Sequence, residues 1–464
     1  MISGRYLSLM AISTIIFGCG DGQQEQPVTG QKQNTEANVK LITLDPGHFH
    51  AALVQKTMYP GIDPKVHVYS PGGSELEAHL RLINQYKERP DNPATWNEVV
   101  YQGNDYFNRM LSEKKGNVVV LSGNNRRKTE YIQQSIDAGL NVLADKPMAI
   151  NEGDFLLLKQ SFENAKAKNV LLYDIMTERS EITNILQREL AAIPEVFGEL
   201  TKGTPAEPAI FIESVHHYYK FVSGNVLTRP MWFFDPLQQG EAIPDVGTHL
   251  VDLIQWEFFP EQTLDYTKDI EIGKSRIWFT PISISQFKAI TKQDSFPEFL
   301  KKYVRDTVLQ THANGEINYS IKGVNARIIA RWDYQAKKGG DTHYAIAKGT
   351  KAHVIIRQGE EEDFQPTLYV MPAGKPDSLA PALENAIKTL NAKYPGIAAE
   401  KYKQGFRISI PEKFKVGHEA HFGEVMERYL NYLKSGNLPA WEVPNMLTKY
   451  YITTQSLKLA EIGR

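Results

Sequence analysis

The segment Gly240–Asp252 (GEAIPDVGTHLVD) carries ionisable side chains at spacings that gather them on one side of a helix. At about 100° per residue, Asp245, His249, Asp252 and Trp256 fall within about 60° of one another and form one polar stripe. A histidine titrates near neutral pH, and a carboxylate four residues away can fix its tautomer and strengthen it as a base. The stripe predicts an acid–base site, although a helix-stabilising carboxylate with a satisfied histidine behind it fits the same pattern.

A second group of polar residues follows two candidate strands. The apolar run Val118–Leu121 predicts a buried parallel strand, and the apolar spacing over Thr129–Ala138 predicts a helix that ends at Gly139. Asn141–Ala144 predicts the next strand. The turn after the first strand consists of Ser122, Gly123, Asn124 and Asn125, and the second strand leads into Asp145, Lys146 and Pro147. Since the carboxyl ends of such strands share one sheet edge, where open α/β sheets bind ligands, we expect a site there.

These segments resemble the Gfo/Idh/MocA oxidoreductases, the glucose-fructose oxidoreductase and inositol dehydrogenase family. Ser122–Asn124 stands for the family's T-P-N, Ala138–Val142 for A-G-K-H-V, Asp145–Pro147 for E-K-P, and Gly240–Asp252 for D-x-G-x-H-x-x-D. The resemblance implies an α/β protein with an N-terminal Rossmann-like parallel-sheet domain and a C-terminal α+β domain whose sheet is largely antiparallel. It also implies NAD or NADP as cofactor, and Lys146, Asp245 and His249 as catalytic residues. Hydride transfer from a sugar needs a base and a cation, and His249 and Lys146 can fill these roles.

The predicted cofactor turn departs from the usual glycine pattern. Lys40–Leu44 predicts a strand, and the turn Asp45–His50 (DPGHFH) keeps only Gly47 of the G-x-G-x-x-G fingerprint. A side chain at His48 or His50 can still donate to a phosphate. Two histidines also suit a metal ion, but no carboxylate pattern lies nearby in the sequence, so we predict no metal site. The predicted cofactor-binding residues are Gly47, His48, Phe49, His50, Ser70, Ser122, Gly123, Asn124, Asn125, Asp145 and Lys146.

The choice between NAD and NADP cannot be read from the sequence. The strand predicted over Val66–Ser70 ends without the acidic residue that would bind ribose hydroxyls, and Glu75 is the nearest acid. Substrate contacts are expected from an aromatic and polar concentration, because a sugar ring stacks on aromatic faces and its hydroxyls need partners. The predicted substrate residues are His216, His217, Lys220, Arg229 and Trp232. An equally good interpretation places Tyr218 and Trp232 in the core.

Composition excludes several classes of function. The chain has 464 residues, 42% of them hydrophobic and 23% charged, which suggests two globular domains. With 52 basic against 54 acidic residues it lacks the basic excess of a nucleic-acid-binding protein, so a small-molecule ligand is expected. Its single cysteine excludes an internal disulfide framework and a cysteine-ligated metal.

The N-terminus predicts export. Met1–Gly18 has a basic residue and a short apolar core, as a signal peptide does, and Ile16-Phe17-Gly18 leads into Cys19 as in a bacterial lipoprotein box. We therefore expect Cys19 to be lipidated in a periplasmic or cell-surface lipoprotein; a plain secretory signal is the alternative. The predicted divisions are a signal peptide at 1–18, a flexible tether at 19–38, a Rossmann-like domain at 39–178 and a substrate domain at 179–464.

The remaining patterns predict secondary structure and leave the function open among three hypotheses. Helices are expected over Glu77–Arg109, with a loop at Arg89–Pro93 between them, and over Glu419–Ser435 and Val443–Ile462. A further parallel strand is expected over Val170–Tyr173, and β-rich segments over Ala209–Val215, Asp269–Phe279, Glu316–Ile321, Ala326–Tyr334 and Tyr344–Arg357. The first functional hypothesis is an NAD(P)-dependent oxidoreductase acting on a carbohydrate hydroxyl with a tightly retained cofactor. The alternatives are a glycoside-cleaving enzyme that oxidises, eliminates and re-reduces, and a non-catalytic sugar-binding protein. A homo-oligomer is left open.

Overall fold

A computed structural model describes residues 38–222, 225–374 and 379–462. The predicted signal peptide, the lipidation site at Cys19 and the tether up to residue 37 lie outside the described residues. In the part of the chain that is described, no helix is both long and apolar enough to cross a membrane.

The first half of the chain forms a parallel sheet with the strand order β3-β2-β1-β4-β5-β6. Its strands are β1 (Leu41–Leu44), β2 (Lys65–Ser70), β3 (Asn97–Gln102), β4 (Val118–Leu121), β5 (Asn141–Asp145) and β6 (Leu172–Ile175). The strand order reverses between β1 and β4, which lie side by side, and ligands bind at such a switch point in open α/β sheets. Every residue of β1 (LITL) and β4 (VVVL) is buried, and the unbroken apolar run of β4 predicts this burial.

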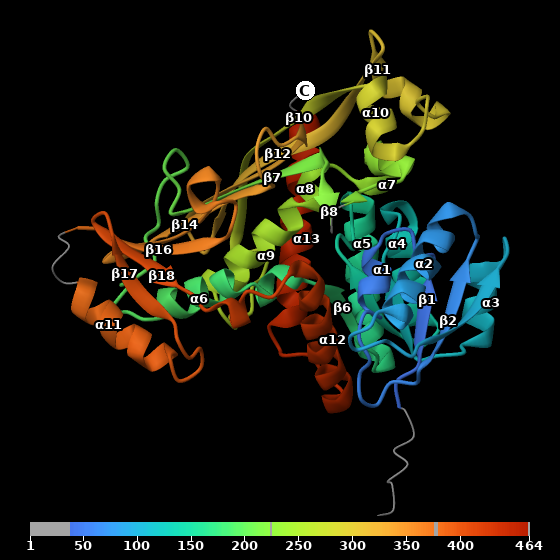
Figure 1. The fold of residues 1–464 in the computed structure, drawn as a ribbon, viewed down its shortest axis with the longest axis horizontal. Coiled ribbons are helices and arrows are strands. Elements are labelled where there is room, and N and C mark those ends of the chain that lie inside the picture. The colour runs from blue at the N-terminus through green and yellow to red at the C-terminus, as the bar shows by residue number, and fades with distance from the viewer. Residues whose placement is uncertain (1–37, 223–224, 375–378, 463–464) are drawn as a thin grey trace, which may run out of the picture. The chain divides into compact units, whose positions relative to one another are not determined.

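Helices pack around this sheet (Figure 1). They are α1 (His50–Leu53), α2 (Ser74–Glu88), α3 (Tyr106–Glu113), α4 (Lys128–Asp137) and α5 (Glu152–Lys168). The helix predicted before Gly139 is confirmed, and Gly139 adopts a φ of 82° that ends it. The prediction of helices joined by a loop over Glu77–Arg109 is wrong in one part, because the strand β3 follows the loop. This strand forms the sheet edge with Val99 and Val100 exposed, so it lacks the apolar run that marks the buried strands.

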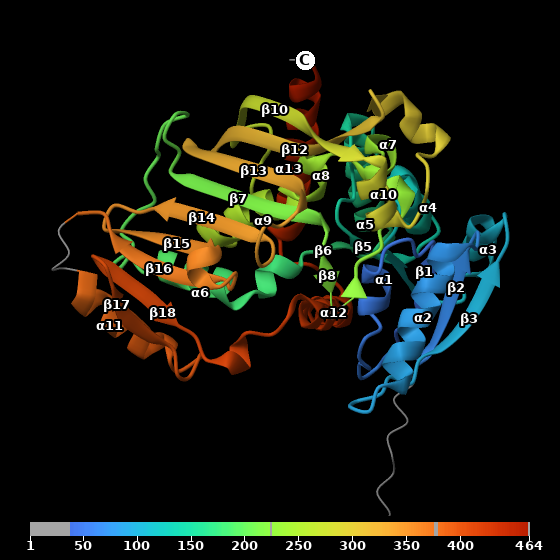
Figure 2. The same cartoon turned by 45° about the horizontal axis from the view of Figure 1, so that its top comes forward.

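The second half forms a larger sheet with the order β10-β12-β13-β7-β14-β15-β16-β18-β17, with β11 paired to β12 (Figure 2). Its strands are β7 (Ile210–Tyr219), β10 (Ile270–Ser283), β11 (Val304–Arg305), β12 (Val308–Ile321), β13 (Val324–Gln335), β14 (Thr342–Lys348), β15 (Ala352–Gln358), β16 (Thr367–Pro372), β17 (Ala398–Tyr402) and β18 (Gly405–Ser409). Only β7 and β13 pair in parallel within this described sheet, so the predicted largely antiparallel sheet is confirmed. The run Tyr344–Arg357 is not one strand but the hairpin β14–β15, which turns at Gly349.

One face of the larger sheet is covered by helices, and along β12 and β13 buried residues alternate with less buried ones. The helices of this half are α6 (Ile182–Ala191), α7 (Pro236–Gln239), α8 (Ala242–Asp245), α9 (Gly247–Phe258), α10 (Ile284–Thr291), α11 (Leu379–Leu390), α12 (His418–Ser435) and α13 (Glu442–Ile462). The short strands β8 (Phe221–Val222) and β9 (Asn225–Val226) pair separately. The alternation along the strands follows from a sheet with one packed face.

The last two helices also complete the core of the parallel sheet. The ring of Tyr429 on α12 stacks on Tyr173 of β6 with 6.1 Å between centroids. The hydroxyl of Tyr450 on α13 donates to Asp174 Oδ2 at 3.0 Å. The division of the chain at residue 178 stays a prediction. In space, α12 packs in the core of the parallel sheet, and α13 contributes buried residues to both cores.

A buried ionic network joins the two halves around Asp252. Its carboxylate accepts from Arg179 at 2.7 Å and from Lys449 at 2.8 Å, and Lys449 also pairs with Asp174 at 2.7 Å. Asp252 was predicted to share a polar stripe with His249, but it faces this network instead. The fold therefore depends on a carboxylate with two buried cationic partners.

We expect Asp252→Ala to destabilise the protein by about 1.5–3 kcal/mol, because it removes the charge-assisted hydrogen bonds from Arg179 and Lys449 to its carboxylate, while Arg179 keeps Glu442 and Lys449 keeps Asp174 as partners. Urea unfolding monitored by circular dichroism measures the change. Asp294→Ala is the control, since Asp294 forms an exposed pair with Lys288 and its loss should matter little. Equal stability of the two variants would contradict the role given to the network.

Candidate active site

The predicted catalytic helix is interrupted between its two key residues. Asp245 ends α8, and His249 lies in the first turn of α9, after Val246 and Gly247. The predicted Asp245–His249 hydrogen bond is absent: within the described residues, buried Nδ1 of His249 has no partner. Asp245 Oδ1 instead accepts from Lys146 Nζ at 2.9 Å, and its carbonyl oxygen lies 3.2 Å from the same nitrogen. The carboxylate of Asp245 thus pairs with Lys146, the residue that follows β5, and not with His249.

The surroundings give Lys146 and His249 opposite protonation preferences. Burial alone would lower the pKa of Lys146, but Asp245 and Asp145 raise it above its usual value. Burial lowers the pKa of His249 well below its usual value, and the positive charge of Lys146 lowers it further. Lys146 is thus an ammonium group beside a neutral imidazole, which supplies a cation and a base.

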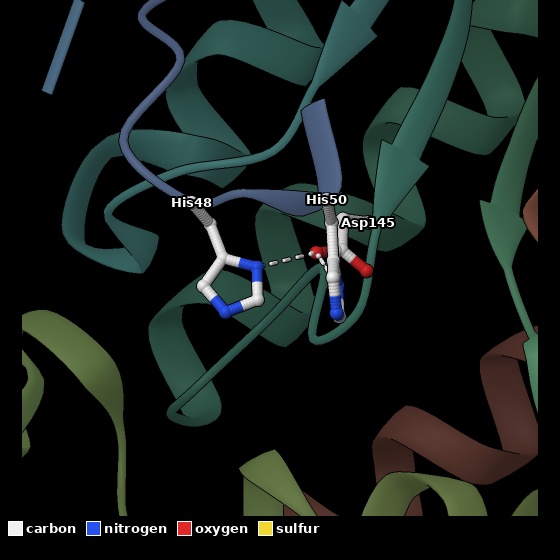
Figure 3. A group of neighbouring side chains, drawn as sticks. All are labelled: His48, His50 and Asp145. Atoms are coloured by element: carbon white, nitrogen blue, oxygen red, sulfur yellow. Dashed lines mark hydrogen bonds and ion pairs between the residues drawn. The ribbon is translucent and has the colours of Figure 1, made fainter. Parts of the chain in front are cut away.

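Asp145, the last residue of β5, gathers three side chains around one carboxylate oxygen. Its Oδ2 lies 2.9 Å from His50 Nδ1 and 2.9 Å from Ser122 Oγ, which donates to it. The Nδ1 of His48 is 3.7 Å from the same oxygen (Figure 3). Burial would raise the pKa of the Asp145 carboxyl, but His50, Lys128 and His48 hold it well below its usual range. His50 was predicted to donate to a phosphate, but its Nδ1 is used by Asp145.

The turn after β1 directs its amides inward. The N–H groups of Gly47 and His48 both donate to the carbonyl of Ser122, at 3.2 and 3.3 Å. A Cβ on Gly123 would lie 2.5 Å from the Asp45 carbonyl, so Gly123 permits the two turns to approach closely. Asp45 replaces the first glycine of the fingerprint and adopts a φ of 47°. This turn is built differently from a phosphate-binding glycine turn.

Three other predicted cofactor residues have their polar groups satisfied within the protein. Asn124 donates to the Gln238 side chain at 2.8 Å, and Asn125 donates to the Gln239 carbonyl at 2.7 Å. Both contacts fasten the turn after β4 to α7. Ser70 Oγ accepts from the N–H of Gly72 at 3.1 Å and shapes the turn after β2. The side chains of Asn124, Asn125 and Ser70 therefore hold in place the turns at the edge of the site.

A cavity of about 560 Å³ lies over the carboxyl ends of β1 and β2. Its lining includes Pro46, Gly47, His48, Phe49, Ser74, Glu75, Ala78, Arg229, Trp232, Phe233 and Gln238. Trp232 Nε1 donates to Glu75 Oε1 at 2.6 Å across it, and burial raises the pKa of Glu75. Gly47, His48, Phe49, Arg229 and Trp232 are thus brought together as predicted binding residues of one cavity.

The remaining predicted substrate residues form a separate group around Asp341. Its carboxylate lies 3.5 Å from His216, 2.9 Å from His217 and 2.8 Å from Lys220. Burial would raise the pKa of Asp341, but the two histidines hold it well below its usual range. Asp341 was not among the predicted residues, because it lies 121 residues from Lys220 and no local pattern connects the two.

Arg229 is held more tightly than a surface arginine. Its guanidinium lies 4.6 Å from the ring centre of Phe233 and 4.8 Å from that of Trp332. It donates to the carbonyls of Tyr218 and His217 at 3.2 and 3.3 Å. Burial lowers its pKa to about 10, which still leaves it a cation at neutral pH. It is a fixed positive charge on the cavity wall.

Comparison with known proteins places the chain in a family. Residues 186–461 match the family described as "Putative oxidoreductase C terminal domain". A crystal structure of a "putative oxidoreductase" from Parabacteroides merdae is 53% identical and superposes with a TM-score of 0.91, covering 92% of this chain and 99% of the other. The chain belongs to the Gfo/Idh/MocA oxidoreductase family.

More distant solved structures share the fold of this family. An oxidoreductase domain protein from Kribbella flavida has 14% identity and a TM-score of 0.60, covering 92% of this chain and 98% of the other. Levoglucosan dehydrogenase in complex with NADH and levoglucosan has 12% identity and a TM-score of 0.58, with the same coverage. No curated protein matches the chain.

Two further residues of this Gfo/Idh/MocA protein reach the catalytic region without having been predicted. Glu178 follows β6, and burial raises its pKa to about 7 while Lys146 opposes the shift. The ring of His418, the first residue of α12, lies 5.5 Å from that of His50, and burial lowers its pKa to about 3. His418 carries no signal in the sequence, since nothing local shows that α12 returns to the parallel sheet.

Proposed function

We propose that this protein is an NAD(P)-dependent oxidoreductase that acts on a carbohydrate hydroxyl. The observation that carries the proposal is the ion pair of Lys146 with Asp245, beside a neutral His249, at the carboxyl edge of the parallel sheet. Removal of hydride from a hydroxyl-bearing carbon needs a base for the hydroxyl proton and a cation for the developing negative charge. The influence of the Lys146 charge on the pKa of His249 supports the assignment of both groups to one site.

The residues around the cavity fit a dinucleotide. A volume of about 560 Å³ lies within the range of about 300–1,000 Å³ for small-molecule and cofactor sites. The cavity lies at the carboxyl ends of β1 and β2, the position where Rossmann-like sheets hold NAD or NADP. Gly47, His48 and Phe49 would line the cofactor, Glu75 offers a carboxylate to ribose hydroxyls, and Arg229 offers a positive charge. Bound NAD or NADP supplies the hydride acceptor.

The chain's own residues then have distinct tasks. His249 accepts the hydroxyl proton, because burial and Lys146 keep its imidazole neutral. Lys146 stabilises the oxygen that loses the proton, and Asp245 holds the Lys146 ammonium in place at 2.9 Å. Trp232 and Arg229 give the cavity an aromatic face and a donor, which suits a sugar. The NADH and levoglucosan carried by levoglucosan dehydrogenase support this substrate class.

We further propose that the cofactor is retained through the catalytic cycle. The signal sequence directs the protein to a compartment where little free NAD replaces what is lost. A Kd of about 1 nM with an association rate of about 10⁶ M⁻¹s⁻¹ gives dissociation at about 10⁻³ s⁻¹, which empties the site within about an hour. Retention therefore requires tighter binding, with the cofactor reduced and reoxidised in place.

The experiment is to dialyse the purified protein extensively, denature it and identify the released nucleotide by absorbance and mass. About one NAD or NADP per chain is the expected result. An empty protein that turns over only when NAD(P) is supplied would refute retention and leave an ordinary dehydrogenase. An empty protein that binds neither nucleotide would refute the cofactor assignment and favour a non-catalytic sugar-binding role.

A lipid anchor at Cys19 is proposed for the mature protein. We expect Cys19→Ser to move the protein from the detergent phase to the aqueous phase, because one cysteine would carry the whole attachment. Detergent phase partitioning of both forms, expressed with the full signal sequence in a bacterial host, measures this. Wild-type protein in the aqueous phase would show that the signal is an ordinary secretory one.

A further inference from the structure

We propose that His48, His50 and Asp145 form a binding site for a divalent transition-metal ion. One potential ligand atom from each residue lies within 4.8 Å of the other two. Figure 3 shows the two imidazole rings approaching Asp145, which ends β5, from the turn that follows β1. Sequence analysis predicted no metal because a carboxylate was lacking; the fold supplies one from 95 residues away.

The distances suit coordination. With metal–ligand bonds of about 2.0–2.2 Å, neighbouring ligand atoms lie about 2.8–3.6 Å apart in octahedral or tetrahedral geometry. The observed separations from Asp145 Oδ2 are 2.9 Å for His50 Nδ1, which lies within that range, and 3.7 Å for His48 Nδ1, which lies just above it. Small side-chain rotations would bring both nitrogens and the oxygen to bonding positions.

An unsatisfied polar atom independently points to a missing ligand. The Nδ1 of His48 is buried and has no hydrogen-bond partner in the described part of the chain. Leaving such a group unpaired costs about 1–3 kcal/mol, so native structures normally provide it with a partner. A metal ion between His48 and Asp145 would use the nitrogen lone pair and remove this cost.

The groups behind the three residues hold them as metal ligands are usually held. Ser122 donates to Asp145 Oδ2 at 2.9 Å, and Lys128 donates to the Asp145 carbonyl at 2.9 Å, which fixes the end of β5. The ring of His50 packs against Phe422 with 4.6 Å between centroids. Such outer contacts orient the ligands and strengthen binding.

The donor set selects the class of ion. Two imidazoles and one carboxylate suit Zn²⁺ or Fe²⁺, whereas Mg²⁺ and Ca²⁺ prefer sites made of oxygen. Three protein ligands leave coordination positions for water or another small ligand. Lys146 follows Asp145 in the sequence, and its positive charge is paired with the carboxylate of Asp245, which reduces its repulsion of a bound cation. His48 also lines the large cavity, so the ion would lie at the cavity wall.

The test uses the complete mature protein, without the predicted signal peptide. It is prepared without a polyhistidine tag, so that no added histidine binds metal. After treatment with a chelator and dialysis, the protein is titrated with ZnCl₂ and, anaerobically, with FeCl₂ by calorimetry, and bound metal is counted by mass spectrometry. We expect one equivalent of Zn²⁺ or Fe²⁺ to bind. Both His48→Gln and His50→Gln should weaken that binding by at least about tenfold, since even outer contacts contribute that much.

His67→Gln is the matched control, because it removes an imidazole from β2, outside the cluster. It should leave the affinity unchanged, and thermal unfolding should show that each variant is folded. If the His50→Gln variant does not fold, the metal affinity of His48→Gln alone tests the site, since His48 is only half-buried. Absence of binding, or binding that His48→Gln leaves as tight as in the wild type, would overturn the site.

Discussion

Replacing Lys146 with alanine should lower kcat by roughly a hundredfold or more, since a positioned charge at a developing oxyanion contributes about that much. The ammonium is held by Asp245 at 2.9 Å, and no other lysine within the described residues is paired with that carboxylate. Steady-state turnover with the best carbohydrate substrate measures the loss. The amount of bound nucleotide should stay near that of the wild type.

Lys115→Ala is the control for this variant, because Lys115 is exposed and lies before β4, away from the site. It should keep full activity. A Lys146→Ala enzyme with the turnover of the control would remove Lys146 from the mechanism, although it would leave the family assignment unchanged.

His249→Ala should reduce turnover by about 10²–10⁴-fold, the usual contribution of a general base. The pH dependence gives a second test. Because burial and Lys146 lower the pKa of His249 well below its usual value, the wild-type enzyme should stay active below pH 6.5. The acid limb of the kcat/KM profile should appear only as the pH falls through the lowered pKa, and it should be missing in His249→Ala. An acid limb unchanged in the variant would assign it to another group.

The lowered pKa of His249 also makes the stability of the folded protein depend on pH, and the direction of that dependence follows from the shift. Below about pH 6.5 an unfolded histidine takes up a proton, whereas native His249 stays neutral until the pH reaches its lowered pKa. The unfolded chain then binds more protons, so the wild-type protein loses stability as the pH falls through this window. The His249→Ala variant should lose less stability than the wild type over the same pH range. Urea unfolding at several pH values measures this difference.

Local patterns were enough to predict the strands and helices that have a clear apolar period. The runs at β4 and β5, the helix ending at Gly139 and the C-terminal helix α12 follow this rule. The edge strand β3 was missed because two exposed valines carry no burial signal. The break at Val246 was missed because Asp245 and His249 have helical spacing whether or not the helix continues.

The site itself depends on contacts between distant parts of the sequence. Lys146 and Asp245 are 99 residues apart, and the resemblance to family motifs was the only means of connecting them. The carboxylates of Asp145 and Asp341 attract histidines that the sequence had assigned to cofactor and substrate. Periodicity cannot reveal such pairs, since the order of strands in the sheets determines them.

The most direct test of the proposed function follows hydride itself. The protein loaded with NAD or NADP is incubated with sugars that carry deuterium on their ring carbons, and the nucleotide is then released and weighed. We expect one deuterium in the nicotinamide for wild-type protein with at least one sugar, and labelling that is roughly a hundredfold slower for Lys146→Ala. A wild-type protein that binds nucleotide and leaves it unlabelled with every sugar tested would contradict hydride transfer from a carbohydrate.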